Sequence, residues 1–226
     1  MAKSSNTPTS SVKEVLRLPP NWLRNGLQGL AFWIGHRCSI YSDWELSEGA
    51  LVGELCSLIH AHLGDDYSLR CERPFTQFVP AGVKSPGVGD MARVDLSVWK
   101  SETVDGQGRR STSPRYAIEI KRAKAAKGKI DADLRRLATI VENSNRIRGI
   151  LCIASEKHLP SRFVNKKGFR RLGVFPIPDT QCSYQVIAVA KASAYLNLKN
   201  INKAHYCCAV EVLPNYYIEE QQERYE

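Results

Sequence analysis

The chain has 226 residues, of which 43% are hydrophobic and 24% charged, a composition typical of a globular domain. Its formal net charge of +9 favours a polyanionic partner, either nucleic acid or an anionic membrane surface. No segment approaches the roughly 18 uninterrupted apolar residues of a membrane-spanning helix, so the sequence argues against an integral helical membrane protein.

The first residues and the cysteines indicate a reducing compartment. Residues 1–11 are small and polar and lack the apolar core of a signal peptide, so we expect a flexible arm on a cytoplasmic protein. The seven cysteines are an odd number without a framework spacing, which favours reduced thiols. Neither His36-x-Cys38 nor His205-x-Cys207-Cys208 has the paired Cys-x-x-Cys spacing of a zinc module, so buried cysteines are the expectation.

Residues 12–40 mix apolar and basic side chains, and we expect this segment to brace the core. The first helix that the pattern clearly defines follows it. Ser42 and Glu45 have the spacing of a capping box and predict a helix over residues 43–63. The apolar stripe of that helix consists of Leu51, Leu55, Leu58 and Ile59. Glu54 falls at the margin of this stripe, where an acid is unexpected.

Three strand candidates follow that helix, over residues 67–73, 92–99 and 116–122, and two of them carry charges in apolar surroundings. Because side chains alternate along a strand, Asp95 faces away from Leu96 and its apolar neighbours. In the same way, Glu119 and Lys121 share one face of the strand 116–122. The polar residues 100–114 between these strands are predicted to be a connection.

An amphipathic helix over residues 129–143 and an apolar strand over 149–154 come next, and further strands are expected at 184–190 and 206–213. A helix that connects two strands implies that they are parallel, whereas the preceding order implies antiparallel neighbours. The sequence therefore predicts an α/β protein with a mixed β-sheet flanked by helices. We divide it into an arm and bracing segment (residues 1–41), one domain (42–213) and a tail (214–226).

The charges on the two strands indicate a specific chemistry. Charges in an apolar strand cost free energy unless they pair or hold an ion. If the strands are adjacent, Asp95 and Glu119 supply the few carboxylates that Mg²⁺ prefers, and the Ile120 carbonyl adds a backbone oxygen. Lys121 would lie beside the ion, where it either orients water and stabilises a pentavalent phosphate or acts as the base. The sequence leaves these two roles of Lys121 open.

Asp95, followed by Glu119-Ile120-Lys121 on the next strand, resembles the PD-(D/E)XK nuclease superfamily. The preceding helix with Glu54 and the helix after the motif are also similar, over about residues 42–154. Val94 stands where the motif has proline, and Pro178-Asp179 has no acid-x-lysine strand after it. The resemblance implies a restriction-endonuclease-like fold with an αβββαβ core.

In function, the resemblance implies an endonuclease that hydrolyses DNA, with Mg²⁺ as cofactor and Mn²⁺ as a substitute. Its catalytic residues would be Glu54, Asp95, Glu119 and Lys121, and its metal ligands Asp95, Glu119 and Ile120. The expected substrate is double-stranded DNA, cut by a restriction-type enzyme. A homodimer is expected, because two strands need two sites.

Basic residues near the motif form a predicted nucleic-acid-binding surface. They are Arg122, Lys124, Lys127, Lys129, Arg135 and Arg136. A second basic cluster with interleaved aromatic rings, suited to a nucleic-acid groove, comprises Arg162, Phe163, Lys166, Lys167, Phe169, Arg170 and Arg171. In both segments the alternative is that the charges are simply solvated.

Two other readings of the chain stay open. It could be a catalytically inactive protein of the nuclease fold that binds nucleic acid. It could also be a structural or interaction protein in which Glu119 and Lys121 form a surface ion pair and Asp95 is a solvated strand residue. These readings differ in one respect: only the nuclease requires the side chains of Asp95, Glu119 and Lys121 to meet.

Overall fold

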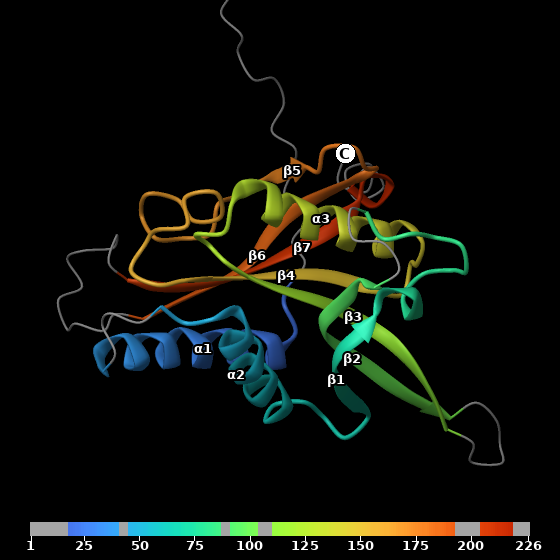
Figure 1. The fold of residues 1–226 in the computed structure, drawn as a ribbon, viewed down its shortest axis with the longest axis horizontal. Coiled ribbons are helices and arrows are strands. Elements are labelled where there is room, and N and C mark those ends of the chain that lie inside the picture. Colours follow the sequence, from blue (N-terminus) through green and yellow to red (C-terminus); the bar gives the residue numbers. More distant parts are fainter. Residues whose placement is uncertain (1–17, 41–44, 87–90, 104–109, 193–203, 219–226) are drawn as a thin grey trace, which may run out of the picture.

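A computed structural model describes residues 18–40, 45–86, 91–103, 110–192 and 204–218. These residues form a seven-stranded mixed β-sheet with helices on both faces (Figure 1). The predicted α/β class and the mixed sheet are thus confirmed. No helix among the described residues is both long and apolar enough to cross a bilayer.

The sheet has the strand order β1-β2-β3-β4-β7-β6-β5. Its strands are β1 (Tyr67–Pro74), β2 (Arg93–Thr103), β3 (Arg110–Arg122), β4 (Arg148–Ser155), β5 (Val174–Pro176), β6 (Cys182–Ala192) and β7 (His205–Pro214). β3 and β4 are parallel, as expected from the helix between them, and the other neighbouring strands are antiparallel.

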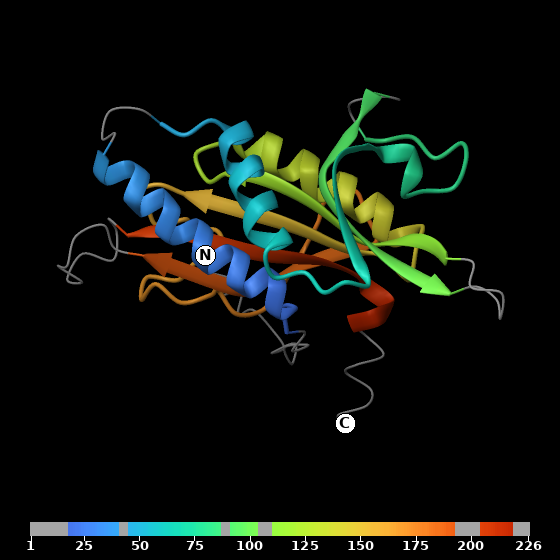
Figure 2. The same cartoon turned by 90° about the horizontal axis from the view of Figure 1, so that it is seen from below.

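The helices divide between the two faces of the sheet. α1 (Asn21–Ile40) and α2 (Glu48–His60) cover one face, α3 (Lys127–Glu142) covers the other, and a short 3₁₀ helix, η1 (Phe75–Gln77), follows β1 (Figures 1 and 2). Two hydrophobic cores result, one on each face. Ile118 and Ile120 of β3 belong to the core under α1 and α2, whereas Ala117 belongs to the core under α3. This alternation turns Glu119 and Lys121 towards α3.

A glycine sets how closely α3 approaches the sheet. A Cβ atom at Gly149 of β4 would lie 3.0 Å from Val141 Cγ2 and 3.3 Å from Leu137 Cβ, both on α3. A larger residue at this position would therefore push the helix away from β4. The close approach holds α3 over the sheet and so fixes the side chains that it directs at β3.

The start of α2 differs from the prediction. The helix begins at Glu48, and its N-cap is Ser47, whose Oγ accepts a hydrogen bond from Ala50 N at 3.1 Å. Glu45 precedes the helix, so the capping box predicted from Ser42 and Glu45 is wrong; Ser42 itself lies outside the described residues. A serine closer to the apolar stripe provides the same capping hydrogen bond.

The hairpin of β2 and β3 is longer than predicted. Residues 100–103 and 110–115 are paired strand, in register from Lys100–Ser113 to Thr103–Arg110, and not a connection. Figure 1 shows this part of β2 and β3 extending from the body of the molecule. Antiparallel pairing satisfies the backbone whatever the side chains are, so polar residues did not end the strands.

Candidate functional site

Glu119 lies near the end of β3 and is almost completely buried, with 1% of its surface exposed. It is paired with Arg136 of α3, whose Nη1 donates to Glu119 Oε1 at 2.8 Å. The Nη2 atom of Arg136 donates to Asp133 Oδ1 at 3.0 Å. One guanidinium therefore holds two carboxylates, one from the sheet and one from the helix above it.

Asp95 reaches the same place from β2. The backbone ladder between β2 and β3 begins at the pair Leu96–Ile118, one residue after Asp95. Where the ladder ends, Asp95 Oδ2 instead accepts a hydrogen bond from the backbone N–H of Ile120 at 2.7 Å. This bond fixes the Asp95 carboxylate against the backbone between Glu119 and Lys121.

Lys121 connects α3 to α2. Its Nζ donates to Glu48 Oε2 at 3.0 Å and lies 3.5 Å from Asp133 Oδ2. Glu48 is the first residue of α2, so the lysine joins elements from the two faces of the sheet. Its side chain is 18% exposed, which leaves the ammonium group partly accessible to a ligand.

These side chains form what we call the charge cluster, which consists of Glu48, Asp95, Glu119, Lys121, Asp133 and Arg136. Four carboxylates face two cations, so two negative charges are uncompensated when all groups are ionised. Such a surplus in partly buried surroundings is costly. Protonation of a carboxylate or binding of a cation would relieve this surplus.

The pKa values reflect this surplus. Burial raises the pKa of Glu119 well above its ordinary value, and the nearby Asp95 carboxylate raises it further, against the opposing effects of Arg136 and Lys121. Burial also raises the pKa of Asp133, although Lys121 and Arg136 oppose that rise. Burial alone would lower the pKa of Lys121, but Asp133 and Glu48 outweigh it, so the pKa is raised and the ammonium group stays protonated.

The structure brings together three of the four predicted catalytic residues, Asp95, Glu119 and Lys121. Glu54, the fourth, is half-buried in α2 and forms no ion pair or hydrogen bond with another described side chain. Glu48, one and a half turns earlier on the same helix, makes the contact with Lys121 instead. Nothing in the apolar pattern of α2 distinguishes Glu48, which is why the sequence did not indicate it.

Asp133 was also missed, although the sequence contains a signal for it. It lies three residues after Ile130 and directly before Leu134, within the apolar face of α3, and is only 2% exposed. An acid on the buried face of a helix is the same kind of anomaly as Glu119 in an apolar strand. The criterion that singled out Glu119 in β3, an acid among apolar residues, would also have found Asp133 in α3.

The predicted nucleic-acid-binding residues fall into two groups. Arg122 and Lys124 pair with Glu45, and Arg136 points inward to the charge cluster. Lys127 and Lys129 are exposed at the start of α3, Arg135 is half-buried on it, and these three form no ion pair with any described residue. They are the members of the set that remain available to a phosphate backbone.

The histidine and cysteine motifs remain separate from the charge cluster. All seven cysteines are free, and His205, Cys207 and Cys208 are buried in β7. Over the described ranges, no three side chains of histidine, cysteine, aspartate or glutamate lie so that they could together hold a metal ion. A metal ion at the charge cluster would therefore have to be one that needs few protein ligands.

The protein is thus a mixed α/β sheet that carries a charged site beneath α3, where β2 and β3 separate. Comparisons with protein-family models, with curated proteins and with solved structures found no match to this chain. The functional argument therefore rests on the residues and their geometry.

Proposed function

We propose that this protein is a Mg²⁺-dependent endonuclease of the restriction-endonuclease-like, PD-(D/E)XK type that hydrolyses phosphodiester bonds in double-stranded DNA. The observation that carries the proposal is the meeting of Asp95, Glu119 and Lys121 at the end of β3. The alternative, a surface ion pair between Glu119 and Lys121, would not require Asp95 to lie beside them from another strand. The proposal includes a cytoplasmic location and a homodimer, in which each copy cuts one strand.

The donor set of the charge cluster fits Mg²⁺. Mg²⁺ prefers oxygen ligands, keeps several of its waters and is usually bound by one or two carboxylates, so it does not need a closed group of three. The Asp95 carboxylate raises the pKa of both Glu119 and Asp133, and Asp133 raises that of Glu119, a repulsion that a divalent cation would relieve. The contact that buried Asp133 Oδ2 makes with Lys121 Nζ is long, at 3.5 Å.

In this proposal Asp95, Glu119 and the Ile120 carbonyl hold the ion, and Mn²⁺ could replace it. Bound there, the ion would supply an activated water and neutralise charge on the phosphate. Asp95 is already oriented by its hydrogen bond from Ile120 N–H. To bind the ion, Glu119 must lose any proton that it holds and share or release its contact with Arg136.

Lys121 acts in this proposal as a cation and not as the base. Its raised pKa keeps it protonated at neutral pH, and two carboxylates, Glu48 and Asp133, hold its ammonium group in place. A positioned ammonium group can orient the attacking water and stabilise the additional negative charge of a pentavalent phosphate. This favours one of the two roles that the sequence left open.

The second candidate function is a nucleic-acid-binding protein that has the nuclease fold without its activity. The pairing of Glu119 with Arg136 favours it, because an arginine already compensates the carboxylate that the metal would need. In that case Arg136 permanently takes the place of a metal ion. The basic residues at the start of α3 would then bind nucleic acid without cleaving it.

The deciding experiment measures Mg²⁺-dependent cleavage of a mixed pool of double-stranded DNA by the wild type and by Lys121→Ala. We expect the variant to lose at least about 100-fold in rate, as when one preorganised donor is removed from an active site, and to retain DNA binding. Lys100→Ala is the matched control, since it removes a lysine from the neighbouring strand β2 outside the cluster.

Two outcomes would contradict the nuclease proposal. If Lys121→Ala cuts as fast as the wild type, the mechanism is wrong. If the wild type binds DNA but does not cut it with Mg²⁺ or Mn²⁺, the inactive binding protein is the better description.

A further inference from the structure

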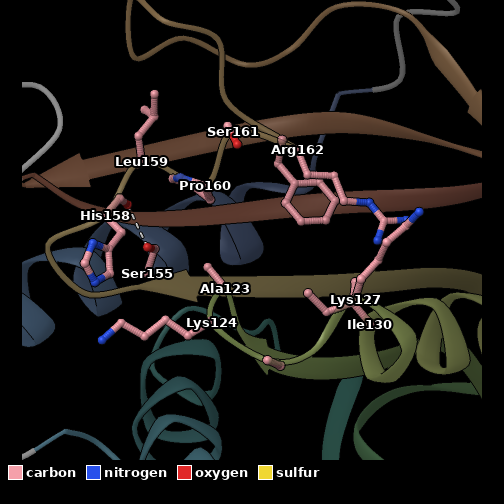
Figure 3. A pocket seen from close by; sticks show the side chains of 12 residues that line it. Ala123, Lys124, Lys127, Ile130, Ser155, His158, Leu159, Pro160, Ser161 and Arg162 are labelled. Atoms are coloured by element: carbon pink, nitrogen blue, oxygen red, sulfur yellow. Dashed lines mark hydrogen bonds between the residues drawn. The ribbon is translucent and has the colours of Figure 1, made fainter.

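A cavity of about 550 Å³ lies beside the charge cluster, on the same face of the sheet as α3. It is bounded on one side by the connection from β3 to α3 and the first turn of α3, and on the other by the end of β4 and residues 158–163 after it. Figure 3 shows Ala123, Lys124, Lys127 and Ile130 on the first side and His158 to Arg162 on the second. Ala123 comes two residues after Lys121, so the cavity adjoins the proposed active site along β3.

The charged part of the lining is cationic. Lys124, Lys127 and Arg162 line the cavity, and no aspartate or glutamate does, although the Lys124 amine pairs with Glu45 and points away from Lys127 and Arg162 (Figure 3). Lys127 has no ion-pair partner among the described residues. Arg162 is 25% exposed, with its Nη2 2.7 Å from Asp131 Oδ1 and its Nε donating to the Tyr184 hydroxyl at 3.2 Å. These contacts hold the guanidinium at the border of the cavity, where its charge would attract an anion.

Apart from Ser155, His158 and Ser161, the remaining lining is apolar and includes the ring of Phe163. Ile130 and Phe163 are buried core residues that face the cavity, and Leu159 and Pro160 come from the segment opposite α3. A space of this size, with an apolar wall and a few convergent polar groups, is typical of small-molecule sites. A ligand that combines an anionic group with a flat, weakly polar ring system would match both parts of the lining.

The position of the cavity in the fold supports the same ligand. It lies at the carboxyl ends of β3 and β4, the parallel pair of the sheet, with the first turn of α3 on its border. Crevices at the carboxyl ends of parallel strands are common places for nucleotides to bind. The cations, the apolar wall and this location all point to a nucleotide.

We propose that this cavity binds a nucleoside 5′-phosphate, with the phosphate at Lys127 and Arg162 and the base against Ile130 and Phe163. The nucleotide is either free or an unstacked nucleotide of a DNA strand. The second source rests on the proposed nuclease function, because it places that nucleotide next to the bond to be cut. Unstacking one nucleotide costs little enough for such contacts to offset it.

The test measures binding of dAMP, inorganic phosphate and a short single-stranded DNA to the full chain by calorimetry, with EDTA present to prevent cleavage. We expect saturable binding of dAMP that is tighter than that of phosphate, because only dAMP can use the apolar wall. Lys127→Glu should weaken dAMP binding by about tenfold or more, the effect of replacing a charge-assisted contact by a repulsive one.

Arg146→Glu is the matched control for Lys127→Glu. It makes the same charge reversal at an exposed residue just beyond the other end of α3, away from the cavity. If both variants weaken dAMP binding equally, or if the wild type does not bind dAMP, the nucleotide site is refuted. Circular dichroism of each variant establishes that it is folded.

Competition between dAMP and the single-stranded DNA distinguishes the two sources. Displacement of dAMP by the DNA supports a nucleotide within a strand, and simultaneous binding of both supports a free nucleotide. Because all measurements are made without a divalent ion, a failure to bind dAMP would leave the Lys121 cleavage experiment unaffected. Loss of cleavage with intact dAMP binding would in turn refute only the nuclease proposal.

Discussion

Two almost completely buried carboxylates lie on the strands β3 and β7 that flank β4, and the difference between them shows what distinguishes a functional site from a structural ion pair. Glu211 of β7 is fully buried and accepts two hydrogen bonds from Arg148 of β4, Nε to Oε1 at 2.7 Å and Nη2 to Oε2 at 2.9 Å. Glu119 of β3 is equally buried but accepts a single hydrogen bond from Arg136 at 2.8 Å.

The pairing of Glu211 is balanced, whereas that of Glu119 is not. Arg148 binds one carboxylate with its Nε and Nη2 atoms in a bidentate contact, and its guanidinium lies 5.4 Å from the ring centroid of Tyr116. Arg136 divides its contacts between Glu119 and Asp133, with Asp95 also close enough to raise the pKa of Glu119. A buried ion pair alone therefore carries no functional information, but unbalanced buried charge does.

The largest effect should come from breaking the balanced pair. Glu211→Gln leaves Arg148 without its counter-charge, and we expect a loss of about 3 kcal/mol in the free energy of unfolding, measured by urea denaturation. Replacing both residues by leucine should recover most of that loss, because no unpaired charge remains. If Glu119→Gln lowers the free energy of unfolding more than Glu211→Gln does, the two pairs do not differ as described.

Mg²⁺ should stabilise the unbalanced site. At an ion concentration ten times the dissociation constant, binding to the folded state alone adds about 1.4 kcal/mol to the free energy of unfolding. The measurement is the unfolding temperature with increasing Mg²⁺, for the wild type and for Asp95→Asn. An equal rise in the variant would mean that the ion binds elsewhere.

Glu119→Gln should stabilise the protein at neutral pH, in contrast to Glu211→Gln. The pKa of Glu119 is higher in the folded state than its ordinary value of 4.5, so above pH 4.5 the folded protein retains a proton that the unfolded chain releases. The free energy of unfolding therefore falls as pH rises from 4.5 through the raised pKa. A neutral glutamine removes this dependence.

We expect the variant to be more stable than the wild type by about 1 kcal/mol at pH 7, in the usual range for substitutions that relieve a strained functional site. The difference should shrink as the pH is lowered to 4.5, in denaturation curves recorded across that range. A difference of the opposite sign at pH 7 would show that the ion pair with Arg136 outweighs the cost of burying the charge.

The smallest effect on stability is expected at Glu48, whose side chain is 41% exposed. Glu48→Gln should change the free energy of unfolding by no more than about 0.5 kcal/mol, as is usual for exposed ion pairs. Cleavage should nevertheless fall by about tenfold, because Lys121 loses one of the carboxylates that position it. Glu54→Gln tests the residue that the sequence indicated, and we expect unchanged cleavage. If Glu54→Gln slows cleavage and Glu48→Gln does not, Glu54 is the functional acid of α2.

Local patterns were sufficient to predict much of the sheet. Apolar runs and alternation located β1, β4, β6 and β7 to within a few residues, and the helix between β3 and β4 implied their parallel pairing. The same patterns failed at the outer part of the β2–β3 hairpin, where backbone pairing with little apolar burial extends both strands. They also failed at α1, where two prolines and mixed residues obscured a helix of 20 residues.

For the candidate site, the sequence by itself determined that Glu119 and Lys121 share a face and that Asp95 lies on a neighbouring strand, because strand alternation is a local rule. Only the tertiary structure decided which helical side chains meet them. Glu48 and Lys121 are 73 residues apart in the chain, and Arg136 reaches Glu119 because α3 packs closely over Gly149. Such contacts depend on how helices pack against a sheet, which involves both cores at once and has no signature in any short segment.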